Sequence, residues 1–306
     1  MVEKETEFFN LRKIMNSGQI FRMYEDREGV FTVYSRDRRL KAEEKDGKVL
    51  FYCSEEEFES CWEDFFDLKR DYGSIVQRAG LEKTGSESAK GREFLKAACT
   101  YASDIRILKQ DVWEMMISFI ISQQKQIPSI RKCIEALCER YGTKHTELDD
   151  GAGETWYGFP DAKAIASAGP EGLKGLSLGY RERYIYETAV RYLSEGIDEN
   201  FYKGMTYEQT RKYLCSFSGI GEKVADCVCL FGCGFTDAFP VDVHIKEVLY
   251  REFFDESRKK TSFDKIPYSE YMTVIDRCFA SFSGVKGIVQ QWIFAYELTL
   301  KSNKRK

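Results

Sequence analysis

The sequence predicts an α+β protein in which a small antiparallel sheet domain precedes a mostly helical, two-lobed body. Short strand-like runs separated by glycine or charged turns fill residues 1–65. Helical periodicity dominates from about residue 69, and a tight glycine turn joins two helices within residues 207–233. We therefore expect a sheet domain with one or two helices over 1–68. One or more helical domains should cover 69–306, with the helical hairpin at 207–233.

Composition narrows the class of protein. A chain of 306 residues exceeds what one core usually serves, so we expect two or three packed units. Hydrophobic residues make up 43% and aromatic residues 14%, which excludes a disordered chain. No run of about 18 apolar residues occurs, so no membrane span is expected. The charged start "MVEKETEFFNLRK" lacks the apolar segment of a signal peptide.

Cysteine content and net charge limit the partners. Ten cysteines in a long chain without an export signal favour reduced, mostly buried thiols over a disulfide framework. The net charge of −4 argues against coating nucleic acid by bulk charge. A nucleic-acid partner would therefore need a local phosphate site.

The first domain is predicted from four strand-like runs and one helix. Residues 54–66 should form the helix, with Ser54 as N-cap and Glu57 completing a capping box. The strand-like runs are "GQIFRMYED", "EGVFTVYSR", "RRLKAEEK" and "GKVLFYCS".

Helices of the second part follow from apolar periodicity and end signals. Pro128 near a first turn and Gly142 beyond a last turn delimit one of them. The expected helices lie within residues 88–102, 111–122, 127–142, 180–196, 206–219, 222–234, 241–254 and 287–302.

The turn "SGIGEK" opens the second helix of the hairpin. Gly219 and Gly221 permit positive φ and close backbone approach. The following helix start would point free N–H groups outward, which suits a phosphate. Taken alone, the turn could equally be an ordinary helix–helix corner.

A lysine and an aspartate stand at two expected helix starts. Lys223 lies where the helix dipole already disfavours positive charge, so its place asks for a chemical reason. Asp242 precedes "VHIKEVL" as an N-cap, and capping alone could explain it. One helix and a short loop separate the two residues, so the chain could bring both to one cleft.

These residues resemble the helix–hairpin–helix Gly/Pro/Asp motif of base-excision DNA glycosylases. More narrowly, "GIGEKVADCVCL" followed by "FPVDVH" resembles the 8-oxoguanine DNA glycosylases, and so do "NSGQIFR", "SFIISQQKQI" and "LGYRERY". The resemblance runs from about residue 8 to residue 300 and is most specific over 213–250. It implies a bifunctional enzyme that removes 8-oxoguanine from duplex DNA and then cleaves the strand.

The resemblance assigns the chemistry to two residues. Lys223 would attack C1′ of the damaged nucleotide, and the resulting Schiff base would allow β-elimination. A free lysine amine has a pKa of about 10.4, and a helix start or a dry pocket disfavours its charged form. Asp242 would stabilise positive charge that develops as the glycosidic bond breaks.

Four residues would line the base pocket. The Gly18 carbonyl would accept from N7–H of 8-oxoguanine, a proton that guanine lacks. Phe294 would stack on the extruded base, and Gln290 would read its Watson–Crick edge. Cys227 would form a wall. Gly18 as a turn glycine, Phe294 and Cys227 as core residues and Gln290 as a solvent-facing side chain are the simpler alternatives.

Further residues would contact DNA. Gln124 would fill the gap left by the extruded base, Tyr180 would wedge into the stack, and Arg181 would contact the orphaned cytosine. His244 would contact a phosphate. Ser129 stands where the family commonly has a second arginine, so we expect relaxed discrimination of the opposite base.

The resemblance also limits cofactors and partners. Only Cys278 follows Asp242, so the four-cysteine iron–sulfur cluster of some relatives is not expected, nor is another cofactor. Cys227, Cys229 and Cys233 share one helix without a histidine at ligand spacing, which disfavours a metal site; a structural ion at the hairpin is the exception we allow. We expect a monomer that acts on double-stranded DNA containing oxidised guanine. It should work in the cytoplasm or nucleoid of a prokaryote or in a nucleus, and should not be secreted.

Two other functions stay open at this stage. A monofunctional alkylated-base glycosylase of the same fold would lack the lysine, and a non-catalytic DNA-binding protein would not need both Lys223 and Asp242.

Overall fold

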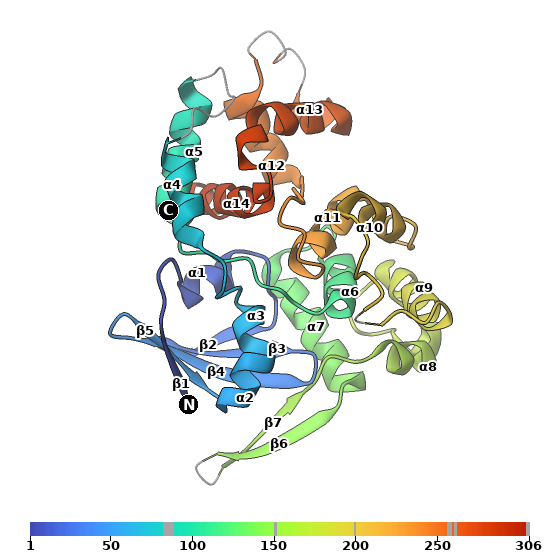
Figure 1. Ribbon diagram of the computed structural model, residues 1–306. Helices are drawn as coiled ribbons and strands as arrows, with labels where there is room; N and C mark the ends of the chain where they lie inside the picture. The colour runs from blue at the N-terminus through green and yellow to red at the C-terminus, as the bar shows by residue number, and fades with distance from the viewer. Residues whose placement is uncertain (82–88, 150–151, 199, 256–258, 260–261, 304–306) are drawn as a thin grey trace.

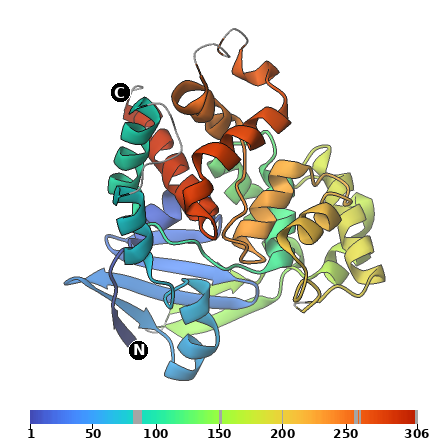
Figure 2. The ribbon, with the colours of Figure 1, turned by 45° about the horizontal axis from the view of Figure 1, so that its top comes forward.

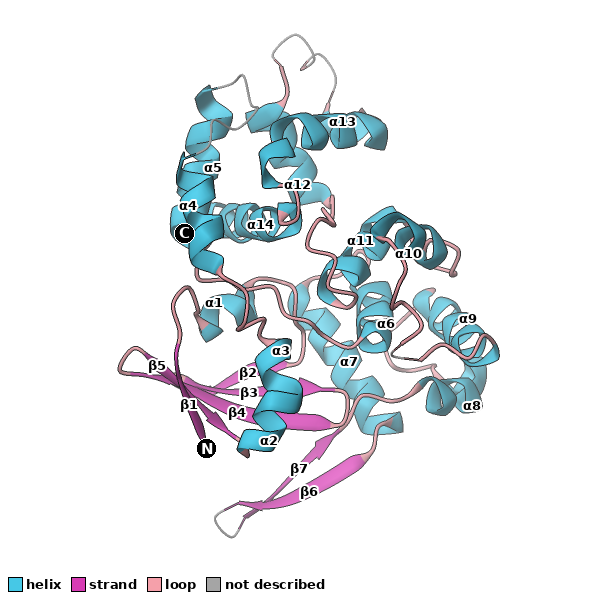
Figure 3. Ribbon diagram, in the orientation of Figure 1, coloured by secondary structure: helices cyan, strands magenta, loops and turns pink. Residues whose placement is uncertain are grey.

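The computed structural model describes residues 1–81, 89–149, 152–198, 200–255, 259 and 262–303. A twisted sheet lies at one end of the molecule, and two groups of helices lie above it (Figure 1). Colouring by secondary structure shows that the strands gather at that end, while the rest of the described chain is helical or loop (Figure 3). This arrangement confirms the α+β class.

The N-terminal sheet has five antiparallel strands in the order β1-β5-β4-β3-β2. Leu40 and Ala42 of β4 alternate with partly exposed neighbours and face the core, as do Val49 and Phe51 of β5. The strands are β1 (Val2–Glu5), β2 (Met23–Arg27), β3 (Val30–Ser35), β4 (Arg38–Lys45) and β5 (Lys48–Tyr52). Four match the predicted runs. β1 was not predicted, because the sequence VEKE carries no apolar alternation and pairs only at the sheet edge.

The predicted helix after the sheet forms in three joined pieces, α2 (Glu55–Glu57), a π-helical turn (Phe58–Trp62) and α3 (Glu63–Phe65). Ser54 caps it by accepting from the Glu57 N–H at 3.1 Å. The reciprocal half of the predicted capping box is wrong, because the Glu57 carboxylate accepts instead from the Trp62 indole at 2.9 Å. A further helix, α1 (Leu11–Asn16), was not predicted.

One helical lobe surrounds α6, whose side chains are nearly all buried. This lobe holds α6 (Val112–Ser122), α7 (Ile127–Tyr141), α8 (Ala162–Gly172), α9 (Arg181–Ser194), α10 (Tyr207–Leu214) and α11 (Glu222–Phe231). It also carries a hairpin of β6 (Lys144–Asp149) and β7 (Ala152–Tyr157). Neither this hairpin nor α8 was predicted from the sequence.

The other lobe joins segments that are distant in sequence. Helix α5 packs along α14, beside α4 and α12 (Figure 2). Its members are α4 (Tyr72–Leu81), α5 (Ala89–Ala102), α12 (Val243–Val248), α13 (Tyr268–Cys278) and α14 (Lys286–Asn303). Short turns complete it: a π-helical turn (Leu249–Phe253) and 3-10 turns (Phe263–Lys265 and Ala280–Phe282). Of the helices in this lobe, α4 and α13 were not predicted.

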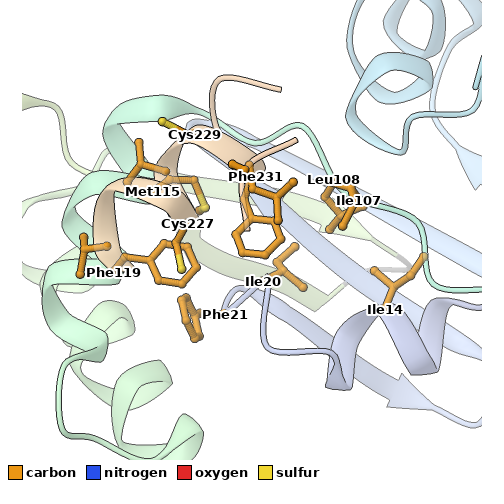
Figure 4. Packing of buried hydrophobic residues seen from close by; sticks show 14 of the residues in the cluster. Ile14, Ile20, Phe21, Ile107, Leu108, Met115, Phe119, Cys227, Cys229 and Phe231 are labelled. Carbon is orange, nitrogen blue, oxygen red and sulfur yellow. The ribbon is translucent and has the colours of Figure 1, made fainter. Parts of the chain in front are cut away.

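A shared core ties the sheet domain to α6 and α11. The rings of Phe119 and Phe231 stack with centroids 5.7 Å apart, and Phe21 meets Phe119 edge-on at 5.5 Å. Ile20 and Cys227 lie in the same cluster (Figure 4). Aromatic pairs of this kind add packing energy beyond their buried area. Helix α11 is therefore held against α6 and, through Phe119, against the sheet domain.

All ten cysteines are free thiols and six of them are buried, which confirms the prediction for the thiols. Within the described residues, no helix is both long enough and apolar enough to cross a membrane.

Candidate functional site

The helical hairpin forms as predicted, but its two glycines serve different needs. Gly219 has φ +79°, and a Cβ there would lie 2.6 Å from the Tyr184 ring of α9. Gly221, by contrast, has φ −86° and open space around it, so the expected positive φ is wrong at this position. It is the N-cap of α11 and offers no side-chain acceptor. The first N–H groups of α11 are thus left for solvent or an anion.

Lys223 and Asp242 meet at one cavity. Lys223 lies half-buried in the first turn of α11, with its Nζ 5.1 Å from the centroid of the Phe119 ring. Asp242 caps α12 by accepting from the Ile245 N–H at 2.8 Å. Both border a cavity of about 40 Å³, which we call the site cavity. The two predicted helix starts therefore converge as the sequence suggested.

The site cavity draws its walls from the sheet domain and from both lobes. Besides Lys223 and Asp242 it is lined by Gly18, Phe119, Cys227, Phe231, Pro240, Gln290, Gln291 and Phe294. Its volume is far below the several hundred Å³ of ordinary ligand pockets. Roomier grooves of about 670 and 840 Å³ lie elsewhere, and neither includes Lys223 or Asp242. The site cavity is identified by its residues and not by its size.

Cys227 is a neutral wall of this cavity. The thiol is buried, and burial raises its pKa to about 11 even though Lys223 lies close enough to oppose the shift. A thiol with this pKa carries almost no thiolate at neutral pH. The arrangement therefore favours the predicted role in packing over a nucleophilic one.

Two hydrogen-bond acceptors at the cavity have no donor among the residues that the structure describes. Gln290 is 3% exposed, donates its amide to the Pro240 carbonyl at 3.1 Å, and has an unpartnered Oε1. Gly18 adopts φ +80°, and a Cβ there would lie 3.0 Å from Cε1 of Phe294. No described residue donates to the Gly18 carbonyl. An unpaired buried acceptor costs free energy, so the Gln290 Oε1 suits a ligand with a matching donor, and the Gly18 carbonyl beside it is free to accept from the same ligand.

The loop between α6 and α7 is fastened to the hairpin turn. Gln124 is exposed and has φ +52°, which is uncommon for a residue other than glycine. Its neighbour Gln123 donates to the Gly219 carbonyl at 2.9 Å. A protruding glutamine is thus held beside the helix start that exposes its N–H groups.

Tyr180 and Arg181 lie next to this loop. Tyr180 is 50% exposed, whereas Arg181 is buried and its guanidinium lies 4.4 Å from the Tyr180 ring centroid. Arg181 donates to the carbonyls of Leu178, at 3.0 Å, and of Gln123. In this conformation Arg181 links the loop before α9 to the loop after α6. To contact a base, its guanidinium would have to leave the carbonyls of Leu178 and Gln123.

His244 follows Asp242 on α12 and meets Phe294 edge-on, with ring centroids 6.1 Å apart. Its Nδ1 lies 2.8 Å from Nζ of Lys301, which also binds Glu247. Because a lysine ammonium only donates, Nδ1 accepts and the ring proton sits on Nε2. His244 therefore offers one N–H donor.

Several contributors escaped the sequence analysis. Phe119 lies beneath Lys223, Pro240 supplies the carbonyl that binds Gln290, and Gln291 borders the cavity. Phe119 and Pro240 stand inside quoted motifs, "SFIISQQ" and "FPVDVH", but their types indicate only core and turn. Nothing in the pattern distinguished Gln291 from Gln290.

Among the described residues, no three or more histidine, cysteine, aspartate or glutamate side chains group as a metal site would require. An ion at the hairpin would have to rest on main-chain carbonyls, and that expectation stays a prediction.

Known families match most of the chain. Residues 1–116 match the family described as "8-oxoguanine DNA glycosylase, N-terminal domain". Residues 117–265 match "HhH-GPD superfamily base excision DNA repair protein".

Individual proteins are similar as well. An N-glycosylase/DNA lyase of Saccharomyces cerevisiae is 34% identical over 182 residues, 54% of this chain and 48% of that protein. The chain thus spans about half the length of that curated relative. Two solved structures match almost end to end. One, described as MBOgg1 in complex with a low affinity DNA ligand, is 30% identical with a TM-score of 0.83, covering 97% of this chain and 94% of the other. The other is the Clostridium acetobutylicum 8-oxoguanine glycosylase/lyase bound to double-stranded DNA with cytosine opposite 8-oxoG. It is 27% identical with a TM-score of 0.84, covering 98% of each chain.

Proposed function

This chain belongs to the 8-oxoguanine DNA glycosylase family of the HhH-GPD superfamily, and on that premise we propose that it removes 8-oxoguanine from duplex DNA and cleaves the strand by β-elimination. The observation that carries the proposal is that Lys223 and Asp242 border one cavity from the starts of two helices. An amine and a carboxylate so placed suit attack on a sugar carbon that becomes positively charged.

The chemistry assigns one role to each group. The neutral Lys223 amine attacks C1′, the bond from C1′ to the base breaks, and the base leaves and takes up a proton. The sugar ring then opens to a Schiff base on Nζ. Loss of a proton from C2′ expels the 3′ phosphate. Asp242 stabilises the positive charge at C1′ during the first step.

The two unpaired acceptors read the base. The Gln290 Oε1 faces a guanine-type edge, whose N1–H and N2–H are donors, whereas adenine presents an acceptor at N1. The Gly18 carbonyl accepts from N7–H of 8-oxoguanine and meets a lone pair at N7 of guanine. Discrimination of this kind is strong because the wrong base leaves a buried polar group unpaired.

The site cavity must enlarge before a base enters, since about 40 Å³ holds little more than a water molecule. Phe294 is the side chain that moves, because its ring lies against Gly18 at the spot the base would occupy. After the shift its ring stacks on the base, and Cys227 forms the opposite wall.

The surrounding loops hold the duplex. Gln124 fills the gap in the helix, Tyr180 wedges into the stack, and Arg181 leaves its carbonyl partners to meet the orphaned base. Phosphates bind the N–H groups at Gly221 and the Nε2–H of His244.

We also propose the domain boundaries, the oligomeric state and the cellular location of the protein. Residues 1–68 act as the sheet domain and 69–306 as the helical body, and the protein acts as a monomer on the chromosome, in a nucleoid or a nucleus.

Borohydride trapping on a duplex with one 8-oxoguanine tests the function. The wild-type protein should give a covalent adduct that Lys223→Gln abolishes. The matched control is Lys212→Gln, an exposed lysine of the same hairpin, which should keep the adduct. Tight binding without any adduct would indicate a non-catalytic DNA-binding protein, and base release without an adduct would indicate a monofunctional glycosylase.

A further inference from the structure

Three buried glutamines from separate segments converge on the main chain around Gly18. Gln291 of α14 donates its amide to the Ser17 carbonyl at 2.5 Å. Gln110, just before α6, donates to the Gln19 carbonyl at 2.8 Å. The Gln19 side chain donates to the Arg106 carbonyl at 2.9 Å and accepts from the Leu108 N–H at 2.8 Å. Their exposures are 2%, 7% and 0%.

The Gln291 bond holds the peptide plane that precedes Gly18, and the Gln110 bond holds the plane that follows Gln19, so the plane of the Gly18 carbonyl lies between two held planes. The carbonyls of Ser17 and Gln19 are engaged, whereas the Gly18 carbonyl between them has no donor among the described residues. Glycine has the least intrinsic preference in backbone dihedrals, so its own geometry does not aim its carbonyl. The direction of that carbonyl is set by the bonds of its neighbours.

We propose that Gln291 is a specificity-determining positioning residue: by holding the Ser17 carbonyl, it aims the Gly18 carbonyl at the purine N7 position. This inference rests on the function proposed above. It divides two adjacent glutamines of α14 between two tasks. Gln290 meets the base itself, whereas Gln291 acts through the main chain of the sheet domain, 274 residues earlier in the sequence.

The test compares two substrates that differ only in the base. Single-turnover cleavage is measured on a duplex with 8-oxoguanine opposite cytosine and on the same duplex with an abasic site, which has nothing for Gly18 to read. Gln291→Met keeps the length and volume but removes the donor. We expect excision of 8-oxoguanine to fall about 5- to 10-fold, the equivalent of one net hydrogen bond, and abasic-site cleavage to be unchanged.

Two further variants sharpen the test. Gln110→Met releases the Gln19 carbonyl from the other side and does not border the site cavity, so the same selective loss excludes direct contact of Gln291 with the base. If Gln291→Met does not fold, the ratio of the two rates in Gln110→Met tests the proposal instead. The control is Trp292→Phe, since the Trp292 indole is buried beside Gln291 in sequence but donates to the Ile105 carbonyl, at 3.0 Å, and to none of residues 17–19. It should lower the melting temperature and leave the ratio of the two rates as in the wild type.

An unchanged ratio in Gln291→Met, or an equal fall of both rates in Gln291→Met and Gln110→Met, would overturn the inference. A wild-type protein that cleaves neither duplex would overturn the proposed function instead.

Discussion

Lys223 and Asp242 stand at the starts of two different helices, α11 and α12, and border the same cavity. The loop that joins the two helices turns the carboxylate back toward the amine. One carboxylate oxygen of Asp242 also caps α12, because it accepts from the Ile245 N–H. Its electrostatic role and its structural role can therefore be separated by substitution.

Asp242→Asn should lose activity and keep stability. Asparagine caps a helix as well as aspartate does, whereas it lacks the charge that stabilises a cationic transition state. Asp242→Ala should lose activity and also about 1 kcal/mol of unfolding free energy, because the cap is gone. Single-turnover excision and urea unfolding measure the two effects. An asparagine variant as active as the wild type would show that the charge is not used.

The two hairpin glycines should respond differently to alanine. Gly219→Ala places a Cβ 2.6 Å from Tyr184 at φ +79°, so we expect a loss of more than about 1 kcal/mol in stability and weaker binding to DNA. Gly221→Ala meets open space at φ −86° and should cost only the difference between glycine and alanine as an N-cap, less than about 1 kcal/mol. Thermal unfolding and a fluorescence-anisotropy titration with duplex compare them. Equal losses would contradict the geometry.

Gly18→Ala should impair excision more than binding to duplex. The added methyl group would lie 3.0 Å from the Phe294 ring at φ +80°, where an L side chain is strained. Both the direction of the Gly18 carbonyl and the space for the base would change. A rate of 8-oxoguanine excision close to that of the wild type would refute this reading of the position, whereas an unchanged duplex affinity is expected.

Buried Glu114 should make stability fall with pH. Burial raises its pKa to about 7, although the positive charge of Arg22 acts to lower it. The folded protein therefore holds a proton that the unfolded chain releases above about pH 4.3, so stability is lost as pH rises from there to about 7 and levels off beyond. In the wild type the Arg36 N–H donates to the Glu114 carboxylate at 2.9 Å. Glu114→Gln keeps an oxygen that can accept this bond and removes the group that titrates.

The unfolding free energy of Glu114→Gln minus that of the wild type should therefore rise by on the order of 1–3 kcal/mol as the pH goes from 5 to 8. Urea unfolding of both proteins at the two pH values measures the difference. A difference that does not vary with pH would show that Glu114 does not titrate in this range.

The base opposite the lesion should matter little. Ser129 is exposed at the start of α7, where a second arginine is expected from the resemblance. We expect similar excision rates opposite cytosine and adenine, and Ser129→Arg should shift the preference toward cytosine. A strong cytosine preference in the wild type would refute the expectation.

Local signals in the sequence determined much of this protein. Apolar periodicity, Pro128 near the start of α7, Asp242 as a cap and the glycine turn predicted the helices on which the chemistry stands. Each depends on interactions between residues a few positions apart. The strands β2 to β5 follow for the same reason, since alternation and short turns are local.

Only the tertiary structure decided which of these residues meet. The 40 Å³ cavity brings Gly18 and Gln290 together, and the bond from Gln291 to Ser17 joins α14 to the sheet domain; within the described chain Gln290 leaves its Oε1 unpaired. The sequence patterns could not reveal them, because a buried polar side chain is defined by its partners and not by its neighbours in sequence. Likewise Gly219 and Gly221 look equivalent in the motif, and only the approach of Tyr184 to one of them makes that glycine necessary.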